Sequence, residues 1–175
     1  MKNLVLGGVK SGKSRFAEQL AGQLSAQLGL PVRLIVTARV LDVEMAERIA
    51  RHQAQRSPHW TTIEAPVHLG LAIQQNAESG VILVDCLTLW LTNLLMAEDE
   101  ALLQEELHAL VQAVQQCDAP LVIVSNETNM GIVPLGAISR RYCDEIGMLH
   151  QRLALICSQV TLVVAGLPLP LKSGT

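Results

Sequence analysis

Aromatic side chains are nearly missing from this sequence: two tryptophans, one tyrosine and one phenylalanine make up 2% of the chain. The core must therefore be built from aliphatic residues, which a hydrophobic content of 50% supplies. The 175 residues also lack a linker-like Gly/Ser/Pro stretch and an internal repeat. We therefore expect residues 1–175 to form a single domain with one sizeable core.

Excess positive charge and long apolar runs are lacking as well. The net charge of −3 and the pI near 5.9 argue against a nucleic-acid-binding surface. No apolar run reaches the roughly 18 residues that a membrane-spanning helix needs. The N-terminus runs directly into a strand-like segment, so we expect no signal peptide. We expect a cytoplasmic protein.

Paired cysteines are also missing. The four cysteines are scattered singly and form no C-x-x-C pair, which argues against a zinc site. We expect them to be reduced and mostly buried, as small apolar residues are. They are Cys86, Cys117, Cys143 and Cys157.

What the chain does contain is a regular alternation of two patterns. Continuous β-branched runs, typical of strands buried on both faces, cover residues 3–7, 32–38, 81–86, 121–125 and 160–166. Segments with a helical period cover residues 13–28, 42–55, 67–75, 101–116 and 138–157. This order predicts an α/β fold with a mainly parallel sheet. We expect "WTTIE" (60–64) to add a short strand and "LPLPLKSGT" (167–175) to be an extended tail.

A phosphate-binding loop follows the first strand. The stretch "GGVKSGKS" matches G-x-x-x-x-G-K-[ST] between a strand and a helix, the context that this motif requires. Its backbone N–H groups and the helix N-terminus are suited to phosphate oxygens, Lys13 to the β and γ phosphates, and Ser14 to Mg²⁺. The predicted nucleotide-binding residues here are Gly7, Gly8, Val9, Lys10, Ser11, Gly12, Lys13 and Ser14.

Two acids end predicted strands. Asp85 closes "VILVD" and fits a carboxylate that holds Mg²⁺ through water. A strand-ending aspartate can equally cap the next helix, but Thr88 is available for that task. Glu64 closes "WTTIE" and either faces the same rim or is simply a solvated strand end. In such sheets, ligands bind beyond the carboxyl ends of the strands.

A histidine lies between two arginines in "AERIARHQAQR". Arg48, His52 and Arg56 fall at i, i+4 and i+8, on one stripe of a helix. Neighbouring cations disfavour imidazolium, and a neutral imidazole can act as a nucleophile at phosphorus while the arginines attract a triphosphate. The pattern alone favours a simpler explanation, a solvated basic helix face with an incidental histidine.

The segment "SNETNMGIVP" (125–134) follows another predicted strand and therefore lies on the same rim. Asn126 and Glu127 can hydrogen-bond a ligand or brace the phosphate loop. The alternative is a structural loop packed through Met130, Ile132 and Val133.

Together these motifs resemble one enzyme family, the bifunctional adenosylcobinamide kinase/adenosylcobinamide-phosphate guanylyltransferases of cobalamin biosynthesis. The resemblance covers most of the chain. The matching pieces are "LGGVKSGKSRFAE", "LDVEMAERIARHQAQRSPHWTTIEAP", "VDCLTLWLTNLL", "SNETNMGIVPLGAISRRYCDEIGMLHQRLA" and "LVVAGLPLPLK". The chain departs from the family pattern at two of these positions. It has Asn129 where the family usually has glycine, and His150 where the family commonly has asparagine.

The resemblance implies a three-layer P-loop NTPase fold of the RecA-like kind and a homotrimer. It implies phosphorylation of adenosylcobinamide with ATP or GTP, then transfer of GMP from GTP to adenosylcobinamide phosphate through a guanylyl-histidine. The nucleophile would be His52, with Lys13 also catalytic. Mg²⁺ would lie at Ser14 and Asp85. Further nucleotide contacts would come from Thr37, Ala38, Arg39, Arg56, Glu64 and Asp85.

Two other readings remain open from the residues themselves. A small-molecule P-loop kinase without a covalent step needs the phosphate loop and Asp85 but gives His52 no task. A nucleotide-binding regulatory subunit would bind nucleotide without turnover.

Overall fold

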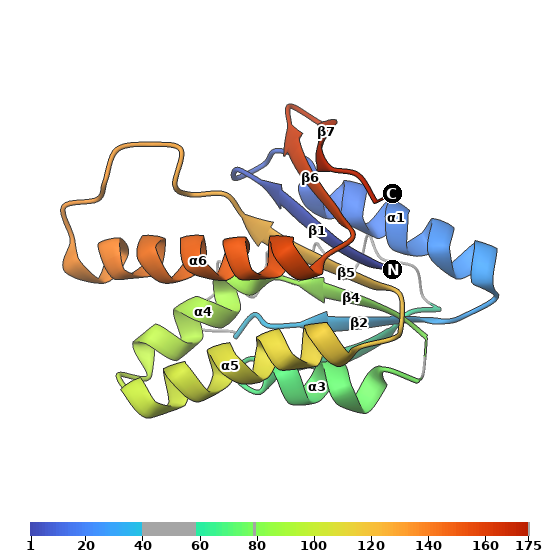
Figure 1. Ribbon diagram of the computed structural model, residues 1–175, viewed down its shortest axis with the longest axis horizontal. Coiled ribbons are helices and arrows are strands. Elements are labelled where there is room, and N and C mark those ends of the chain that lie inside the picture. Colours follow the sequence, from blue (N-terminus) through green and yellow to red (C-terminus); the bar gives the residue numbers. More distant parts are fainter. Residues whose placement is uncertain (40–58, 79, 175) are drawn as a thin grey trace.

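The computed structural model describes residues 1–39, 59–78 and 80–174. Within them runs a seven-stranded sheet with the order β3-β2-β4-β5-β1-β6-β7 (Figure 1). All neighbouring strands pair in parallel except β6 and β7, which are antiparallel. The strands are β1 (Lys2–Gly7), β2 (Val32–Val36), β3 (Thr61–Glu64), β4 (Val81–Asp85), β5 (Leu121–Asn126), β6 (Gln159–Val164) and β7 (Leu167–Lys172).

The helices form one layer on each face of this sheet. Helix α1 (Lys13–Leu28) packs over one face, and the remaining described helices pack over the other (Figure 1). Those helices are α3 (Leu69–Asn76), α4 (Leu87–Met96), α5 (Glu100–Gln116) and α6 (Ala137–Ile156). The helix expected over residues 42–55 lies outside the described residues. The structure confirms the three-layer α/β fold with a mainly parallel sheet.

The core is accordingly divided into two clusters by the sheet. A smaller cluster beneath α1 contains Val5, Leu34, Leu83 and Val124. A larger one beneath α3 to α6 contains Leu4, Ile35, Ile82 and Ile123, together with the fully buried Trp90. Because alternate residues of the central strands are buried on opposite faces, these strands read as continuous apolar runs rather than alternating ones.

The last strand corrects the expectation for the C-terminal segment. Residues Leu167–Lys172 form β7 rather than an extended tail. A two-residue turn joins it to β6, with positive φ at Ala165 (52°) and Gly166 (79°), as a tight hairpin requires. The segment contains Pro168 and Pro170, which lack a backbone N–H. On an edge strand a proline can direct its nitrogen away from the partner strand, so the pairing survives.

The helix after Asp85 corrects a second expectation. Residues Leu87–Met96 form α4, whose N-cap is Cys86, and no described side chain caps this end. The Thr88 hydroxyl accepts a hydrogen bond from the backbone N–H of Asn126 (2.9 Å). Thr88 therefore ties α4 to the end of β5 instead of capping its own helix.

Candidate nucleotide-binding site

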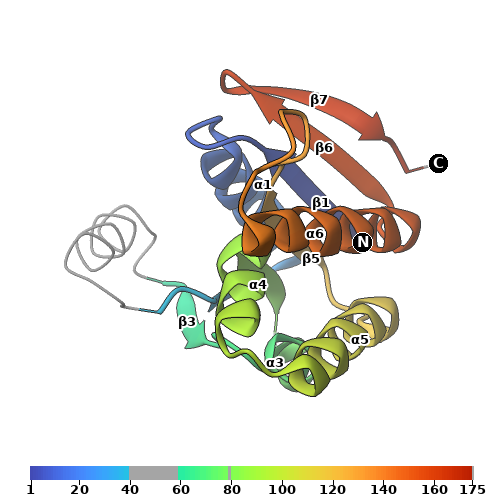
Figure 2. The same cartoon turned by 90° about the vertical axis from the view of Figure 1, so that its left-hand side faces the viewer.

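The predicted site residues of the described chain gather at one end of the sheet. Strands β1, β3, β4 and β5 run parallel, so the phosphate loop, Glu64, Asp85 and Asn126 all lie at their carboxyl ends. Gly7 lies opposite Asn126, and Val36 lies opposite both Glu64 and Asp85. The expected placement on one rim is confirmed. Figure 2 looks onto this end of the sheet, where the loops after β1 and β5 emerge.

These polar residues also share the α1 face of the sheet. Leu83 and Val124 belong to the cluster beneath α1, so Asp85 and Asn126, each two residues further on, are turned toward the same side. Ile63 packs against the opposite cluster, which turns the neighbouring Glu64 toward α1 as well. The phosphate loop leads into α1, which begins at Lys13. Glu64, Asp85 and Asn126 therefore lie on the same face of the sheet as the phosphate loop.

The phosphate loop has the backbone geometry of an anion site. Gly12 (φ 96°) and Lys10 (φ 55°) adopt left-handed conformations, and the N–H of Ser11 returns to the carbonyl of Gly8 (3.2 Å). Helix α1 follows with Gly12 as N-cap and without a side-chain cap from any described residue. Its first backbone N–H groups therefore remain suited to phosphate oxygens, assisted by the helix dipole.

Lys13 is held against this loop. Its Nζ donates a hydrogen bond to the carbonyl oxygen of Gly8 (3.1 Å), and the residue is only 9% exposed. The ammonium group thus lies beside the concavity that the loop encloses, where a triphosphate would bring its β and γ oxygens. Exchange of the neutral carbonyl partner for anionic phosphate oxygens gives Lys13 a stronger hydrogen bond, because donor and acceptor then both carry charge.

Two segments that are distant in sequence support the loop from outside. The N–H of Gly166 donates to the carbonyl of Ser11 (2.8 Å), and the N–H of Glu127 donates to the carbonyl of Gly7 (3.1 Å). A Cβ atom on Gly12 would lie 3.1 Å from the Cα of Gly166, so the β6–β7 turn presses directly on the loop. This support was not predicted from the sequence. The Ala165-Gly166 pair, a turn signal at the end of a strand, was the available clue.

Thr37 joins the ends of β2 and β4. It is fully buried, its hydroxyl donates to the carbonyl of Cys86 (2.6 Å) and accepts from the Cys86 N–H (3.0 Å), and its own N–H donates to the carbonyl of Asp85 (3.2 Å). Asn93 extends this brace, because its Nδ2 donates to the carbonyls of Thr37 (2.8 Å) and Pro66 (2.9 Å). Thr37 thus holds the backbone of Asp85 through its own N–H and the backbone of Cys86 through its hydroxyl. Contacts of Thr37, Ala38 and Arg39 with nucleotide stay predictions.

The electrostatics beside Asp85 keep the next residue neutral. Burial raises the pKa of the Cys86 thiol, and the Asp85 carboxylate raises it further. Cys86 therefore remains a protonated thiol near neutral pH and is neither a thiolate nucleophile nor a thiolate metal ligand.

Oxygen donors for a magnesium ion are present on this rim. The Ser14 hydroxyl opens α1 and the half-buried Asp85 ends β4. The described residues contain no group of three or more His, Cys, Asp or Glu side chains able to hold a metal by themselves. Mg²⁺ is usually held by one or two protein oxygens plus substrate phosphates and water, so Ser14 and Asp85 fit a magnesium ion that arrives with a nucleotide.

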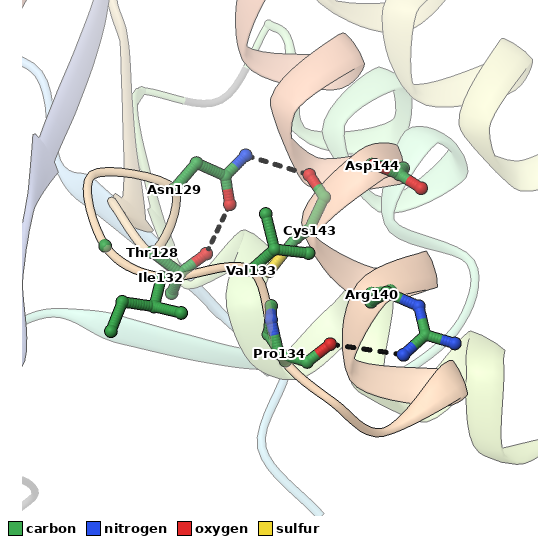
Figure 3. A pocket seen from close by; sticks show the side chains of 9 residues that line it. Thr128, Asn129, Ile132, Val133, Pro134, Arg140, Cys143 and Asp144 are labelled. Atoms are coloured by element: carbon green, nitrogen blue, oxygen red, sulfur yellow. Dashed lines mark hydrogen bonds between the residues drawn. The ribbon is translucent and has the colours of Figure 1, made fainter.

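The segment between β5 and α6 forms an open pocket of about 370 Å³ next to this rim (Figure 3). Asn129 donates through Nδ2 to the carbonyl of Cys143 (2.8 Å), and Arg140 donates to the carbonyls of Pro134 (3.2 Å) and Leu135. Ile132 and Leu135 are 98% and 96% exposed. The alternative in which this segment is a structural loop packed through Met130, Ile132 and Val133 is wrong within the described residues, because all three side chains are largely exposed.

Three residues of the predicted arginine–histidine stripe, Arg48, His52 and Arg56, lie outside the described residues. Their predicted roles therefore stay predictions. In the described part of the chain, no helix is long and apolar enough to cross a membrane.

Comparison with known proteins supports the fold and identifies the family. In structure, the chain is similar to a KaiC-like protein from Pyrococcus horikoshii OT3, with a TM-score of 0.53 at 15% identity over 92% of this chain and 69% of that one. The chain therefore shares the three-layer α/β fold of that KaiC-like protein. In sequence it is 51% identical over 173 residues to the bifunctional adenosylcobalamin biosynthesis protein CobP of Pseudomonas aeruginosa, covering 98% of both chains.

A second relative is the bifunctional adenosylcobalamin biosynthesis protein CobU of Salmonella typhimurium, 39% identical over 186 residues, which cover 98% of this chain and all of the relative. The family model described as cobinamide kinase / cobinamide phosphate guanyltransferase matches residues 3–171. That range includes the phosphate loop, every strand-end residue of the rim and the β6–β7 turn. The chain belongs to the cobinamide kinase / cobinamide phosphate guanyltransferase family.

Proposed function

We propose that this protein phosphorylates adenosylcobinamide with ATP or GTP and then converts the product to adenosylcobinamide-GDP with GTP, releasing pyrophosphate. The observation that carries the proposal is a complete phosphate loop on the same rim as Asp85 and Asn126, in a chain that matches the family from residue 3 to residue 171. We further propose that it works in the cytoplasm as a homotrimer.

In the first reaction the acceptor hydroxyl attacks the γ-phosphorus, and the bond to the oxygen bridging the β and γ phosphates breaks. The chain contributes positioning and charge. Backbone N–H groups of the loop cradle the phosphates, and the Lys13 ammonium offsets charge that accumulates on the β and γ oxygens. Ser14 and Asp85 would hold Mg²⁺, which neutralises phosphate charge when bound.

In the second reaction a ring nitrogen of His52 attacks the α-phosphorus of GTP, and pyrophosphate leaves. A phosphate oxygen of the acceptor then attacks the same phosphorus, which releases GMP from the histidine onto the product. Neutral imidazole is required as the nucleophile, and the neighbouring Arg48 and Arg56 of the sequence favour that form. Arg56, Arg39 and Glu64 are proposed to contact the nucleotide.

The decisive experiment measures the intact mass of the protein after incubation with GTP and Mg²⁺. We expect an added guanylyl group that maps to His52 in peptides handled under alkaline conditions, because phosphoramidates at histidine are labile to acid. His52→Ala should lose the adduct and the second reaction yet keep most phosphorylation of adenosylcobinamide. His59→Ala, seven residues further on, is the matched control and should keep both activities.

Two outcomes would contradict the covalent assignment: an adduct on another residue, or a fully active His52→Ala protein. Retained phosphorylation with no adduct on the wild-type chain would favour a small-molecule kinase without a covalent step. Nucleotide binding with no turnover would favour a regulatory subunit.

A further inference from the structure

A buried histidine lies behind the rim with no part in the proposed chemistry. His150 of α6 is 7% exposed, and its ring lies between two residues at the end of β5. Its Nε2 is 2.8 Å from the Oγ of Ser125, which is fully buried, and its Nδ1 is 3.8 Å from a carboxylate oxygen of Glu127. Ser125 and Glu127 thus both lie against the imidazole ring of His150.

Ser125 and Glu127 are the residues on either side of Asn126. Ile123 belongs to the cluster beneath α3 to α6, so Ser125, two residues later, is turned toward α6. Asn126 is turned the other way, toward α1 and the phosphate loop. His150 therefore fixes both neighbours of Asn126 on one face and leaves the Asn126 side chain directed to the other.

The same short segment is tied to the rest of the rim. The N–H of Asn126 donates to the Thr88 hydroxyl (2.9 Å), and the N–H of Glu127 donates to the carbonyl of Gly7 (3.1 Å). The other Glu127 oxygen accepts the N–H of Asn129 (2.7 Å). Since β5 lies between β1 and β4, Asn126 occupies the position between the phosphate loop and Asp85.

Burial and the nearby Glu127 carboxylate determine the protonation state and the tautomer of the His150 ring. Burial lowers the pKa of His150, and the Glu127 carboxylate only partly opposes this, so the imidazole is neutral near pH 7. A neutral ring has one N–H donor and one acceptor nitrogen. With the proton on Nδ1, the donor faces the Glu127 carboxylate and Nε2 accepts from the Ser125 hydroxyl. The opposite tautomer would direct a lone pair at the carboxylate.

We propose that His150 is a positioning residue for phosphoryl transfer, which holds Ser125 and Glu127 so that Asn126 is directed toward the phosphates between Lys13 and Asp85. This inference rests on the proposed kinase reaction. His150 touches neither nucleotide nor acceptor. It acts through Asn126, whose amide can donate to a phosphate oxygen or orient the acceptor hydroxyl.

A histidine that merely fills space in the core would behave differently. Its loss would lower the free energy of unfolding and leave turnover per folded molecule unchanged. A positioning histidine changes kcat, because a misplaced Asn126 is still compatible with nucleotide binding through the phosphate loop but not with correct alignment of the reacting groups. The ratio of these two effects distinguishes the roles.

The experiment compares His150→Leu, His150→Asn and Leu153→Ala with the wild type in phosphorylation of adenosylcobinamide. His150→Leu should lower kcat at least about tenfold and change the KM for nucleotide by less than about threefold. The amide nitrogen of asparagine can take the place of Nδ1, so His150→Asn should recover most of kcat. Leu153, fully buried one turn further along α6, is the control, and Leu153→Ala should lower stability without lowering kcat per folded molecule.

A double-mutant cycle then tests the route of the effect. In an Asn126→Ala background, His150→Leu should cause little further loss of kcat, because the residue through which it acts is already gone. If His150→Leu does not fold, Ser125→Ala removes one partner of the ring and is read in the same way. A normal kcat in His150→Leu or in Ser125→Ala, or fully additive losses with Asn126→Ala, would overturn the role of His150. A wild-type chain that transfers no phosphoryl group would instead overturn the proposed function itself.

Discussion

Gly166 donates its backbone N–H to the carbonyl oxygen of Ser11 over 2.8 Å, so the turn between the last two strands supports the phosphate loop near the start of the chain. The two segments are also closely packed, since a Cβ atom on Gly12 would lie 3.1 Å from the Cα of Gly166. The hairpin of β6 and β7 is therefore part of the nucleotide site, although its side chains need not touch the nucleotide.

The first prediction follows from this close packing. A Cβ on Gly7 would lie 2.6 Å from the carbonyl oxygen of Val163 and 2.5 Å from the Ser11 Oγ, so Gly7→Ala must displace the end of β6 or the loop. We expect a loss of about 1–3 kcal/mol in the free energy of unfolding, as overpacking usually causes, together with weaker nucleotide binding. Denaturant unfolding of the apo protein measures it.

Gly8→Ala is the matched control. No described atom lies within 4 Å of a Cβ at this position. Its apo stability should stay within about 0.5 kcal/mol of the wild type, as for a substitution at an open position. Equal destabilisation by the two substitutions would show that β6 does not pack on the loop as described.

The second prediction concerns Lys13. Lys13→Ala should weaken binding of GTP about tenfold to a hundredfold, because a charge-assisted hydrogen bond to phosphate is worth ~1.5–3 kcal/mol. Thermal unfolding of the apo protein should change little. Calorimetric titration with GTP measures the affinity, and Lys172→Ala, which removes the same charge at the far end of β7, is the control. Unchanged affinity in Lys13→Ala would overturn the assignment of the site.

How far the sequence predicts this structure can be judged from particular elements. The continuous apolar runs of β1, β4 and β5 predict buried parallel strands, and the parallel arrangement by itself brings the phosphate loop, Asp85 and Asn126 to one rim. The phosphate loop, Gly7 to Ser14, could also be predicted, because its short motif requires a strand before it and a helix after it. These features depend on local pattern, and local pattern is present in a single sequence.

Contacts between segments that are distant in the sequence could not be predicted from such patterns. The support of Ser11 by Gly166 and the burial of His150 against Ser125 join residues more than twenty positions apart, and pattern does not encode such pairings. Thr88 was misread because a threonine near a helix start usually caps it, whereas here the end of β5 supplies a competing N–H. Residues Leu167–Lys172 were expected to be an extended tail because their pairing with β6 depends on the turn at Ala165 and Gly166, which no strand pattern of their own announces.

The third prediction concerns pH. Burial depresses the pKa of His150 below its ordinary value of 6.5, and Glu127, the carboxylate that faces the ring, acts in the opposite direction without cancelling it. The unfolded chain therefore takes up a proton near pH 6.5 that the native chain still excludes. The stabilisation is fully present above about pH 6.5 and is lost as pH falls through the lower native pKa.

The measurement is the free energy of unfolding of the wild type minus that of His150→Leu between pH 5 and pH 8. This difference should decline toward acid pH, because the leucine variant lacks the titrating group while other histidines are common to both proteins. A difference that is constant, or that grows toward acid pH, would contradict the neutral buried ring.

The last prediction concerns Asp85 and magnesium. If Asp85 and Ser14 hold the ion that accompanies a nucleotide, Asp85→Asn should lose most of the gain in GTP affinity that Mg²⁺ provides and should leave affinity in the presence of a chelator nearly unchanged. Asparagine keeps the size of the side chain and one carbonyl oxygen but loses the negative charge that a hard cation prefers. The dissociation constant for GTP, measured with and without Mg²⁺, separates this effect from general damage to the phosphate loop, which would weaken binding under both conditions.

Asp118→Asn makes the same chemical change at an exposed residue just before β5, at the opposite edge of the sheet, and should alter neither dissociation constant. An Asp85→Asn protein with a normal response to Mg²⁺ would remove Asp85 from the metal site and leave it as a structural partner of Thr37.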